Sequence, residues 1–212
     1  MRVKRPELHV VTTGRQPAER VVPVLAEISP LVDRIHLREK ALSAGEVYRM
    51  AASLAERGVP PEKIIINDRV DVAVAIGAGG VQLAWHSLRM SVVRRAFPGL
   101  RAGRSVHSEK EADEAVRDGA DWLIYGHVFP TRSKPGLSPR GLEELGSIIR
   151  RQPVPVIAIG GILPENAGLP LEAGAAGIAV MSGILERPDP AKAAWEYAAI
   201  LNRWVKKHGT NL

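Results

Sequence analysis

The sequence contains no cysteine, which excludes disulfide bonds and zinc sites of the cysteine type. Long hydrophobic runs are missing as well. The first fifteen residues, MRVKRPELHVVTTGR, have a basic start, but their apolar run is far shorter than the core of a signal peptide or a membrane span. From these absences we expect a cytoplasmic protein that does not enter a membrane.

The chain also lacks any Ser-, Gly- or Pro-rich linker and any shift in composition that would divide its 212 residues. A chain of this length can bury one sizeable core. We therefore expect residues 1–212 to form a single domain.

The net charge is +6, a balance that on its own permits nucleic-acid binding. The cations are scattered in pairs, such as Arg94-Arg95 and Lys206-Lys207, and they are interleaved with carboxylates. No aromatic-basic stacking pattern, helix-turn-helix or zinc finger is present. Scattered charge of this kind is typical of a solvated surface, so we expect no nucleic-acid partner.

Eight short apolar runs recur along the chain, and each is followed by a segment with apolar residues at three- and four-residue spacing. The runs are LHVV, RIHLRE, KIIIND, GVQLA, RAGRSV, WLIYG, VPVIAIGG and GIAVMSG. Eight strand-plus-helix units predict a (β/α)8 TIM barrel. A doubly wound open sheet is the competing architecture, but the turn after the first run is Thr12-Thr13-Gly14 and not the glycine-rich G-x-G-x-x-G.

In such a barrel the reacting groups come from the carboxyl ends of the strands. The residues at these ends are mostly cations, hydroxyls or glycines, which suits an anionic ligand. The seventh and eighth strands, where barrels often hold a phosphate on backbone N–H groups, end on Gly160, Gly161, Ser182 and Gly183. We predict a phosphate site there, and the alternative reason for these glycines is a tight turn.

A second group of polar residues follows the second and third strands. Arg38 and Lys40 alternate, so with Glu39 pointing away they would face one side together with His36. They form either a second anion subsite, for a carboxylate or a pyrophosphate, or a pair of surface cations. Asp68 either ligates magnesium or caps the following helix, and we favour the cap.

Seven motifs stand in fixed order from Leu8 to about Ile184: HLREK, IIINDRVDVA, GVQL, GRSVH, YGHVFPT, PVIAIGG and GIAVMSG. Together they resemble the thiamine phosphate synthase superfamily, and more closely its TenI-like thiazole tautomerase branch. The synthases of this superfamily carry a glutamine before an L-R-x-K pattern, a G-Q-x-D segment that supplies a magnesium aspartate, and a proline after the glycine of the sixth strand. At these three places the chain has His36, Ala84-Trp85-His86-Ser87 and His127.

The resemblance implies an isomerase of thiamine biosynthesis that aromatises a carboxy-thiazole phosphate without a metal or another cofactor. It implies that His127 is the general acid and base, because an imidazole takes and gives protons near neutral pH. Arg38 and Lys40 would face the carboxylate of this small-molecule substrate. The other expected substrate-binding residues are Ser105, His36 and, on a loop carried over from the T-x-T/S-K pattern of the synthases, Thr131, Ser133 and Lys134.

Two other functions stay open. A thiamine phosphate synthase would share the fold and the phosphate subsite, but it would release pyrophosphate from a pyrimidine pyrophosphate with magnesium. A regulatory or ligand-binding barrel without catalysis is the third possibility. Apolar residues scattered over the outer helices lead us to expect a homodimer.

Overall fold

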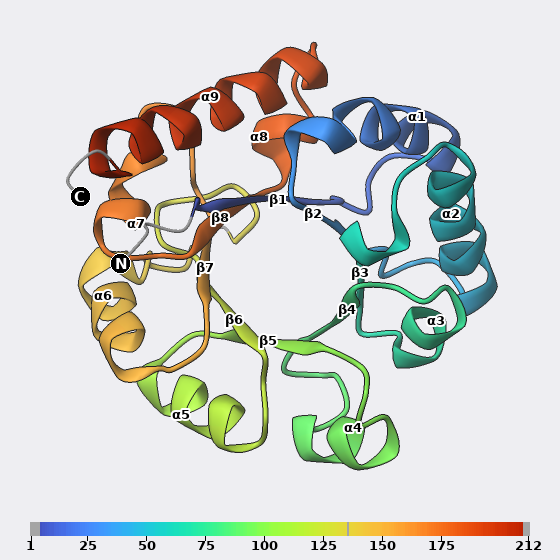
Figure 1. Cartoon of the computed structure of the whole chain (residues 1–212), viewed down its shortest axis with the longest axis horizontal. Helices are drawn as coiled ribbons and strands as arrows, with labels where there is room; N and C mark the ends of the chain where they lie inside the picture. Colours follow the sequence, from blue (N-terminus) through green and yellow to red (C-terminus); the bar gives the residue numbers. More distant parts are fainter. Residues whose placement is uncertain (1–4, 135, 210–212) are drawn as a thin grey trace.

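The computed structural model describes residues 5–134 and 136–209, and its eight parallel strands close into a barrel in the order of the sequence. Figure 1 looks down this barrel and shows the helices as an outer ring. The predicted (β/α)8 TIM barrel is confirmed, and the open-sheet alternative is wrong. Among the described residues, no helix combines the length and the apolar character that crossing a membrane requires.

The strands are short. They are β1 (Glu7–Val11), β2 (Arg34–Leu37), β3 (Ile64–Asn67), β4 (Gly80–Leu83), β5 (Ala102–Val106), β6 (Trp122–Gly126), β7 (Val156–Ile159) and β8 (Gly177–Val180). The helices are α1 (Ala18–Ile28), α2 (Ala44–Glu56), α3 (Val70–Ala75), α4 (Met90–Ala96), α5 (Glu109–Arg117), α6 (Gly141–Arg151), α7 (Gly168–Glu172), α8 (Ser182–Leu185) and α9 (Pro190–Gly209). Two single 3₁₀ turns, η1 (Ser29–Leu31) and η2 (Pro61–Lys63), precede β2 and β3.

Strand residues pack on both faces of the barrel wall. One set, including Leu8, Val10 and Ile35, lies in the large core between the barrel and the helices. The alternate set fills the barrel interior and consists of Val11, Ile65, Trp122, Ile124, Ile157 and Ala179. Each buried side chain of this size contributes about 1.5–3 kcal/mol of transfer free energy, which explains why the strands read as continuous apolar runs.

Local signals fix where the helices begin. The hydroxyl of Ser43 accepts a hydrogen bond from the amide of Glu46, and the carboxylate of Glu46 accepts one from the amide of Ser43 at 2.8 Å. This capping box starts α2 and so sets the length of the connection between β2 and that helix. The connection carries Arg38, Glu39 and Lys40, three of the residues that the sequence places at the candidate site.

Candidate active site

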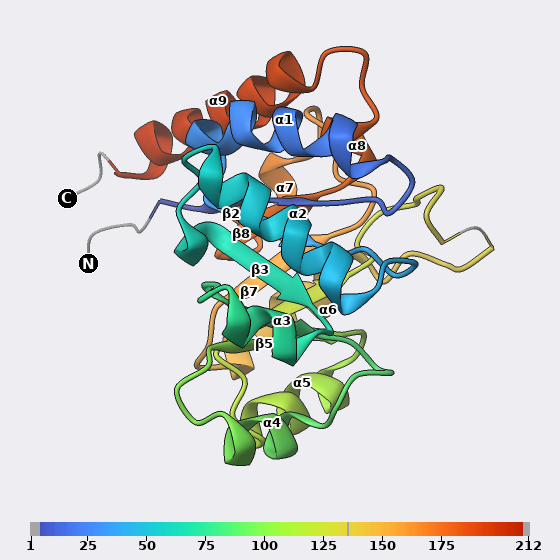
Figure 2. The same ribbon diagram turned by 90° about the vertical axis from the view of Figure 1, so that its right-hand side faces the viewer.

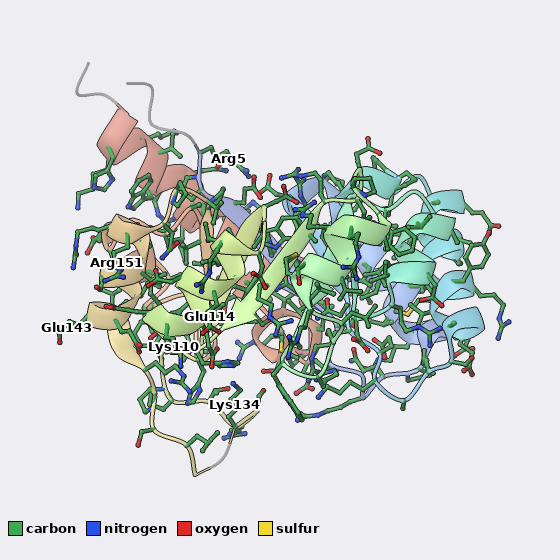
Figure 3. All side chains as sticks on the ribbon, turned by 90° about the horizontal axis from the view of Figure 1, so that it is seen from below. Arg5, Lys110, Glu114, Lys134, Glu143 and Arg151 are labelled. Atoms are coloured by element: carbon green, nitrogen blue, oxygen red, sulfur yellow. The ribbon has the colours of Figure 1, made fainter. Side chains whose placement is uncertain are left out.

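The carboxyl ends of the strands open at one end of the barrel. In Figure 2 the β3 arrow points toward this end, and the yellow loop between β6 and α6 projects from it. Figure 3 shows Lys134, which this loop carries, at the opposite end of the molecule from Arg5. The β6–α6 loop and Lys134 therefore lie at the end where barrels carry out their chemistry.

The glycines that end β7 are required by close packing of two loops. Gly160 has φ +99° and Gly161 has φ +66°, a region that favours glycine. A Cβ atom on Gly160 would lie 2.3 Å from Cβ of His127, and one on Gly161 would lie 2.4 Å from the carbonyl oxygen of Pro130. The tight-turn explanation for these glycines is therefore confirmed, and it does not compete with phosphate binding.

Helix α8 begins directly after β8, at Ser182 and Gly183. Within the part of the chain that the structure describes, the amides of Gly160, Gly161, Ser182 and Gly183 donate to no backbone oxygen. Amides at a helix start carry partial positive charge and favour an anion. This pairing of a β7 turn with a short helix after β8 is the arrangement in which barrels often hold phosphate.

His127 lies where β6 meets the loop and is only 4% exposed. Its Nε2 lies 3.2 Å from the carbonyl oxygen of Leu137 and donates to it, while its Nδ1 is buried without a partner in the described chain. Its own carbonyl accepts a hydrogen bond from the amide of Arg140 at 2.9 Å, and its peptide bond to Gly126 is cis. The histidine thus ties the far side of the loop back to the barrel.

Several cations converge beside this loop. Nζ of Lys134 lies 3.2 Å from Nε2 of His107, and burial followed by repulsion from Arg140 and Arg38 lowers the pKa of Lys134. Burial also lowers the pKa of Arg38, and Arg15 adds to this effect. Positive groups that repel one another in a partly buried place favour an anion among them.

The strand geometry expected for Arg38 and Lys40 is not present. Strand β2 ends at Leu37, so the alternation of a strand does not extend to Lys40, which is exposed in the following turn. Arg38 is held by its backbone, because its amide donates to Oγ1 of Thr12 at 2.8 Å. Glu39 does not simply point away. It is half-buried, and this burial raises the pKa of its carboxyl.

The favoured role of Asp68 as a helix cap is wrong. Arg69 occupies the cap position of α3, and no side chain caps this helix. Asp68 has φ +67° and is the one non-glycine residue with positive φ in the described chain. An Asp tolerates this conformation better than most residues, and such departures gather at functional sites. Next to it, Oδ1 of Asn67 is buried without a partner among the described residues.

The other predicted substrate residues are distributed unevenly. Ser105 accepts a hydrogen bond from Nε2 of Gln82 at 3.0 Å, and Gln82 in turn accepts one from Nε1 of Trp122 at 2.8 Å. Thr131 accepts from the amide of Ser133, whose side chain is exposed on the loop. The sequence analysis assigns Gln82 no role, although a lone amide in the apolar run GVQLA is a visible signal.

His36 lies deeper than predicted, inside the barrel and fully buried. Its Nε2 is 3.0 Å from Nδ1 of His9, whose Nε2 is 3.0 Å from the carboxylate of Glu7. Burial, followed by the charge of His9, lowers the pKa of His36 well below its usual value. His36 is therefore neutral in the folded protein at neutral pH, and its Nδ1 has no partner in the described chain.

We expect this burial to make stability depend on pH. Below pH about 6.5 the unfolded chain binds a proton at His36 that the folded chain does not bind, so the free energy of unfolding should fall as pH drops. The contribution of His36 is at most about 1.4 kcal/mol per pH unit. Urea unfolding at several pH values between 7.5 and 5.5 measures it, with His36→Asn expected to show a shallower fall. The exposed His86 offers the control, since His86→Asn should keep the wild-type slope; an unchanged slope in His36→Asn would contradict the assignment.

Four similarities to known proteins bear on what this site does. The sequence profile described as thiamine monophosphate synthase matches residues 8–184. Thiamine-phosphate synthase of Chlorobium luteolum is 41% identical over 83% of this chain and 84% of its own, and that of Pyrococcus furiosus is 37% identical over 92% and 94%. The solved structure of thiamine phosphate pyrophosphorylase from Pyrococcus furiosus superposes with a TM-score of 0.81 at 34% identity, over 94% of this chain and 97% of that one.

These relatives correct the expected activity. The tautomerase branch was inferred from local departures at His36, at Ala84-Trp85-His86-Ser87 and at His127, but the relatives that match most of the chain are named as synthases. The prediction that the chain is an isomerase is therefore wrong, whereas the predicted link to thiamine biosynthesis is supported. The match over residues 8–184 shows that the chain belongs to the thiamine monophosphate synthase family.

Proposed function

We propose that this chain is a thiamine-phosphate synthase, which transfers a pyrimidine from its pyrophosphate to a thiazole phosphate and releases pyrophosphate. The names of its relatives support this choice. The observation that supports it is that backbone amides without a backbone acceptor in the described chain and partly buried cations lie at the same end of the barrel, and we assign each of them to one anion.

The two substrates carry anions that suit these amides and cations. The single phosphate of the thiazole would lie on the amides of Gly160, Gly161, Ser182 and Gly183, where no side chain keeps its oxygens away from the two glycine amides. The pyrophosphate of the pyrimidine would lie against Arg38 and Lys134, with Lys40 at the exposed edge. Side-chain hydroxyls of Ser105, Thr131 and Ser133 would offer further hydrogen bonds, and His36 would support the site from below.

The reaction forms a bond between the thiazole and the pyrimidine-bearing carbon while the bond from that carbon to the pyrophosphate oxygen breaks. The electron pair of the broken bond leaves with the pyrophosphate, so negative charge grows on its oxygens. Arg38 and Lys134 are partly buried and already repel each other. Fixed cations in such a place stabilise developing negative charge without having to reorganise.

The synthase activity implies magnesium, and the residues present fit an ion that holds mainly to the substrate. Mg²⁺ commonly binds one or two carboxylates together with substrate phosphates. Asp68 would supply one carboxylate, and the amide oxygen of Asn67 beside it, which lies near the ring of His36, would supply a buried acceptor. When bound, the ion would neutralise charge on the pyrophosphate. The second aspartate of the synthase pattern is replaced by Ser87, whose hydroxyl accepts from the amide of Ala84.

His127 has a positioning role in this proposal. It binds the carbonyl of Leu137 through Nε2, and its carbonyl binds the amide of Arg140. These two bonds close the loop that carries Lys134. His127 would thereby hold the lysine over the pyrophosphate, and it needs no proton transfer of its own.

The test is product formation by the purified chain. We expect thiamine phosphate and pyrophosphate to appear in equal amounts when a pyrimidine pyrophosphate and a thiazole phosphate are supplied with magnesium, as measured by mass spectrometry and a pyrophosphate assay. Asp68→Asn should lower the rate by about a hundredfold, the usual scale for a lost charge contact in a transition state. Absence of product with the folded wild-type protein, both substrates and magnesium would overturn the proposal.

A further inference from the structure

A cavity of about 250 Å³ lies at the other end of the barrel, among the amino ends of the strands. It is lined by residues from the starts of β1, β2 and β6 and by residues that directly precede β4, β5, β7 and β8. Of the residues described above around the candidate active site, only the supporting ones Glu7, His9 and Trp122 line it within the described chain. In most barrels this end serves stability, so an open cavity here needs its own explanation.

The cavity wall carries arginine side chains without a bound carboxylate. Arg34 donates to the carbonyl oxygen of Asp33 at 2.9 Å, and the guanidinium of Arg101 lies 5.5 Å from the centre of the Trp122 ring. Within residues 5–134 and 136–209 neither arginine forms an ion pair. Arg5, which also lines the cavity, differs because both of its contacts with the Asp33 carboxylate are 2.8 Å long.

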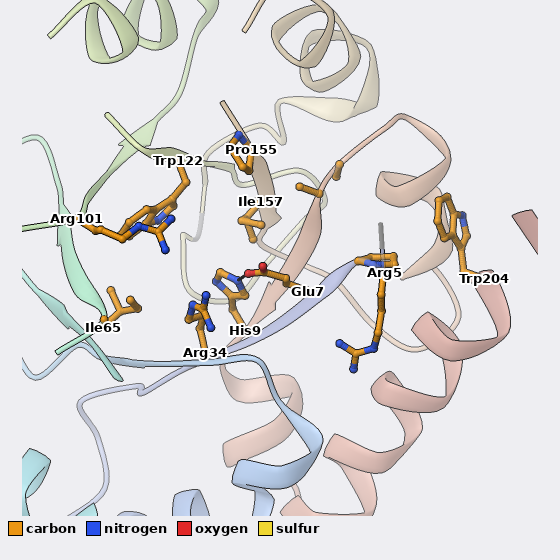
Figure 4. A pocket seen from close by; sticks show the side chains of 14 residues that line it. Arg5, Glu7, His9, Arg34, Ile65, Arg101, Trp122, Pro155, Ile157 and Trp204 are labelled. Carbon is orange, nitrogen blue, oxygen red and sulfur yellow. Dashed lines mark hydrogen bonds and ion pairs between the residues drawn. The ribbon is translucent and has the colours of Figure 1, made fainter. Parts of the chain in front are cut away.

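Figure 4 shows how these groups lie. Arg101 extends along Trp122 on one side, and Arg34 stands next to His9 on the other, with Ile157 above them. His9 is bonded to the carboxylate of Glu7, the one acidic side chain of the lining. Two guanidinium groups therefore face a cavity whose carboxylate already accepts a hydrogen bond from a histidine.

The apolar part of the lining lies beside Arg101 and is closely packed. Trp122 is 7% exposed, and Nε1 of its ring is fixed by Gln82. The ring lies so close to β4 and β5 that a Cβ atom on Gly80 or Gly103 would come within 2.7 Å or 2.1 Å of it. With Ile65 and Ile157 beside it, the ring gives a flat surface that is already in place before any ligand binds.

We propose that this mouth of the barrel binds a small flat carboxylate. The carboxylate would lie between Arg34 and Arg101, because a guanidinium group matches its two oxygens. The apolar part would lie against Ile65, Ile157 and the small exposed part of Trp122, because Arg101 lies over the face of that ring. A dry cavity of roughly 150 Å³ holds a benzene molecule, so the space here suffices for one aromatic ring and a carboxylate. The site does not depend on the proposed synthase activity.

Benzoate is the probe that tests this site, with binding measured by calorimetry and by amide chemical shifts. We expect a Kd on the order of 1 mM, an ordinary affinity for so small a ligand. Arg101→Gln should weaken binding at least tenfold and move the shifts around β5 and β6. Arg38→Gln is the matched control at the other end of the barrel, and it should bind benzoate as the wild type does. A melting curve for each variant checks that it is folded.

Three results would overturn the site. Equal binding by the wild type and by the folded double variant Arg34→Gln/Arg101→Gln would show that the arginines are not used. Loss of binding in Arg38→Gln alone would place benzoate at the catalytic end. If sulfate binds as tightly as benzoate at equal ionic strength, the apolar residues of the cavity do not contribute to binding. Synthase turnover is not a readout in any of these experiments, so failure here leaves the proposed function untouched.

Discussion

Replacing Gly160 by alanine is expected to lower the free energy of unfolding by about 2–4 kcal/mol, the range for strain at a special backbone position combined with overpacking. The backbone at this position has φ +99°, which a side chain rarely adopts. The new Cβ atom would lie 2.3 Å from Cβ of His127 and 2.7 Å from its Cα. Neither of these atoms can rotate away, so the two loops must separate.

Urea unfolding of the wild type and Gly160→Ala measures this loss, and Gly168→Ala is the matched control. Gly168 lies at the start of α7 and has no positive φ, and a Cβ atom added to it would point into open space. The control should therefore change the free energy of unfolding by less than about 1 kcal/mol, in either direction. Similar losses in both variants would mean that the packing of Gly160 on His127 does not determine stability.

The same contact joins the β6 loop to the turn that ends β7. The amides of Val128 and Phe129 donate to the carbonyl oxygens of Ile159 and Gly160 at 2.9 and 3.0 Å. The β6 loop is thus bonded along the turn that ends β7. A change in this turn should therefore also displace Lys134, which the loop carries, and we expect Gly160→Ala to lose synthase activity as well as stability.

The fold could be predicted from the sequence because its signals are local. Each strand of a closed parallel barrel is covered on both faces, so it reads as an apolar run, and eight runs with helices between them leave few other architectures. The positions of Gly160-Gly161 after β7 and of Ser182-Gly183 after β8 could be predicted for the same reason. Their positions follow from the strand ends alone.

The wrong predictions about site residues depended on where a strand ends or on the backbone conformation of a single residue. Lys40 lies outside β2 because the strand ends three residues earlier, at Leu37, a boundary that no pattern marks. Asp68 has a left-handed backbone and lies one residue before the cap position of α3, which Arg69 occupies, so the expected cap is absent. The predicted isomerase activity is wrong because differences at three places do not outweigh relatives that match most of the chain and are named thiamine-phosphate synthase.

Contacts between segments that lie far apart in the sequence could not be predicted either. The pairing of His9 with His36 joins two strands, and only the closed barrel places their ring nitrogens 3.0 Å apart. The sequence did carry a hint, since His9 is the polar residue within the apolar run of β1. The cavity at the amino ends of the strands had no sequence signal, because its lining comes from most of the strands.

Replacing Arg38 by glutamine is expected to reduce kcat/KM for the pyrimidine pyrophosphate by about 100- to 1,000-fold, the scale measured when one fixed group that stabilises transition-state charge is removed. Arg38 is partly buried, and burial lowers its pKa, so its charge is more effective than that of a solvated side chain. Its amide is anchored to Thr12, which keeps its backbone in place when the side chain changes.

Steady-state kinetics with each substrate varied in turn separates this role from a general defect. The KM for the thiazole phosphate should stay within about threefold, because that substrate is assigned to the backbone amides and not to Arg38. Lys40→Gln is the control, since Lys40 carries the same charge two residues away but is exposed to solvent. We expect it to lose less than about tenfold. If Lys40→Gln loses as much kcat/KM as Arg38→Gln, the pyrophosphate lies over the exposed turn after β2. The partly buried cations Arg38 and Lys134 then have no special part in binding it.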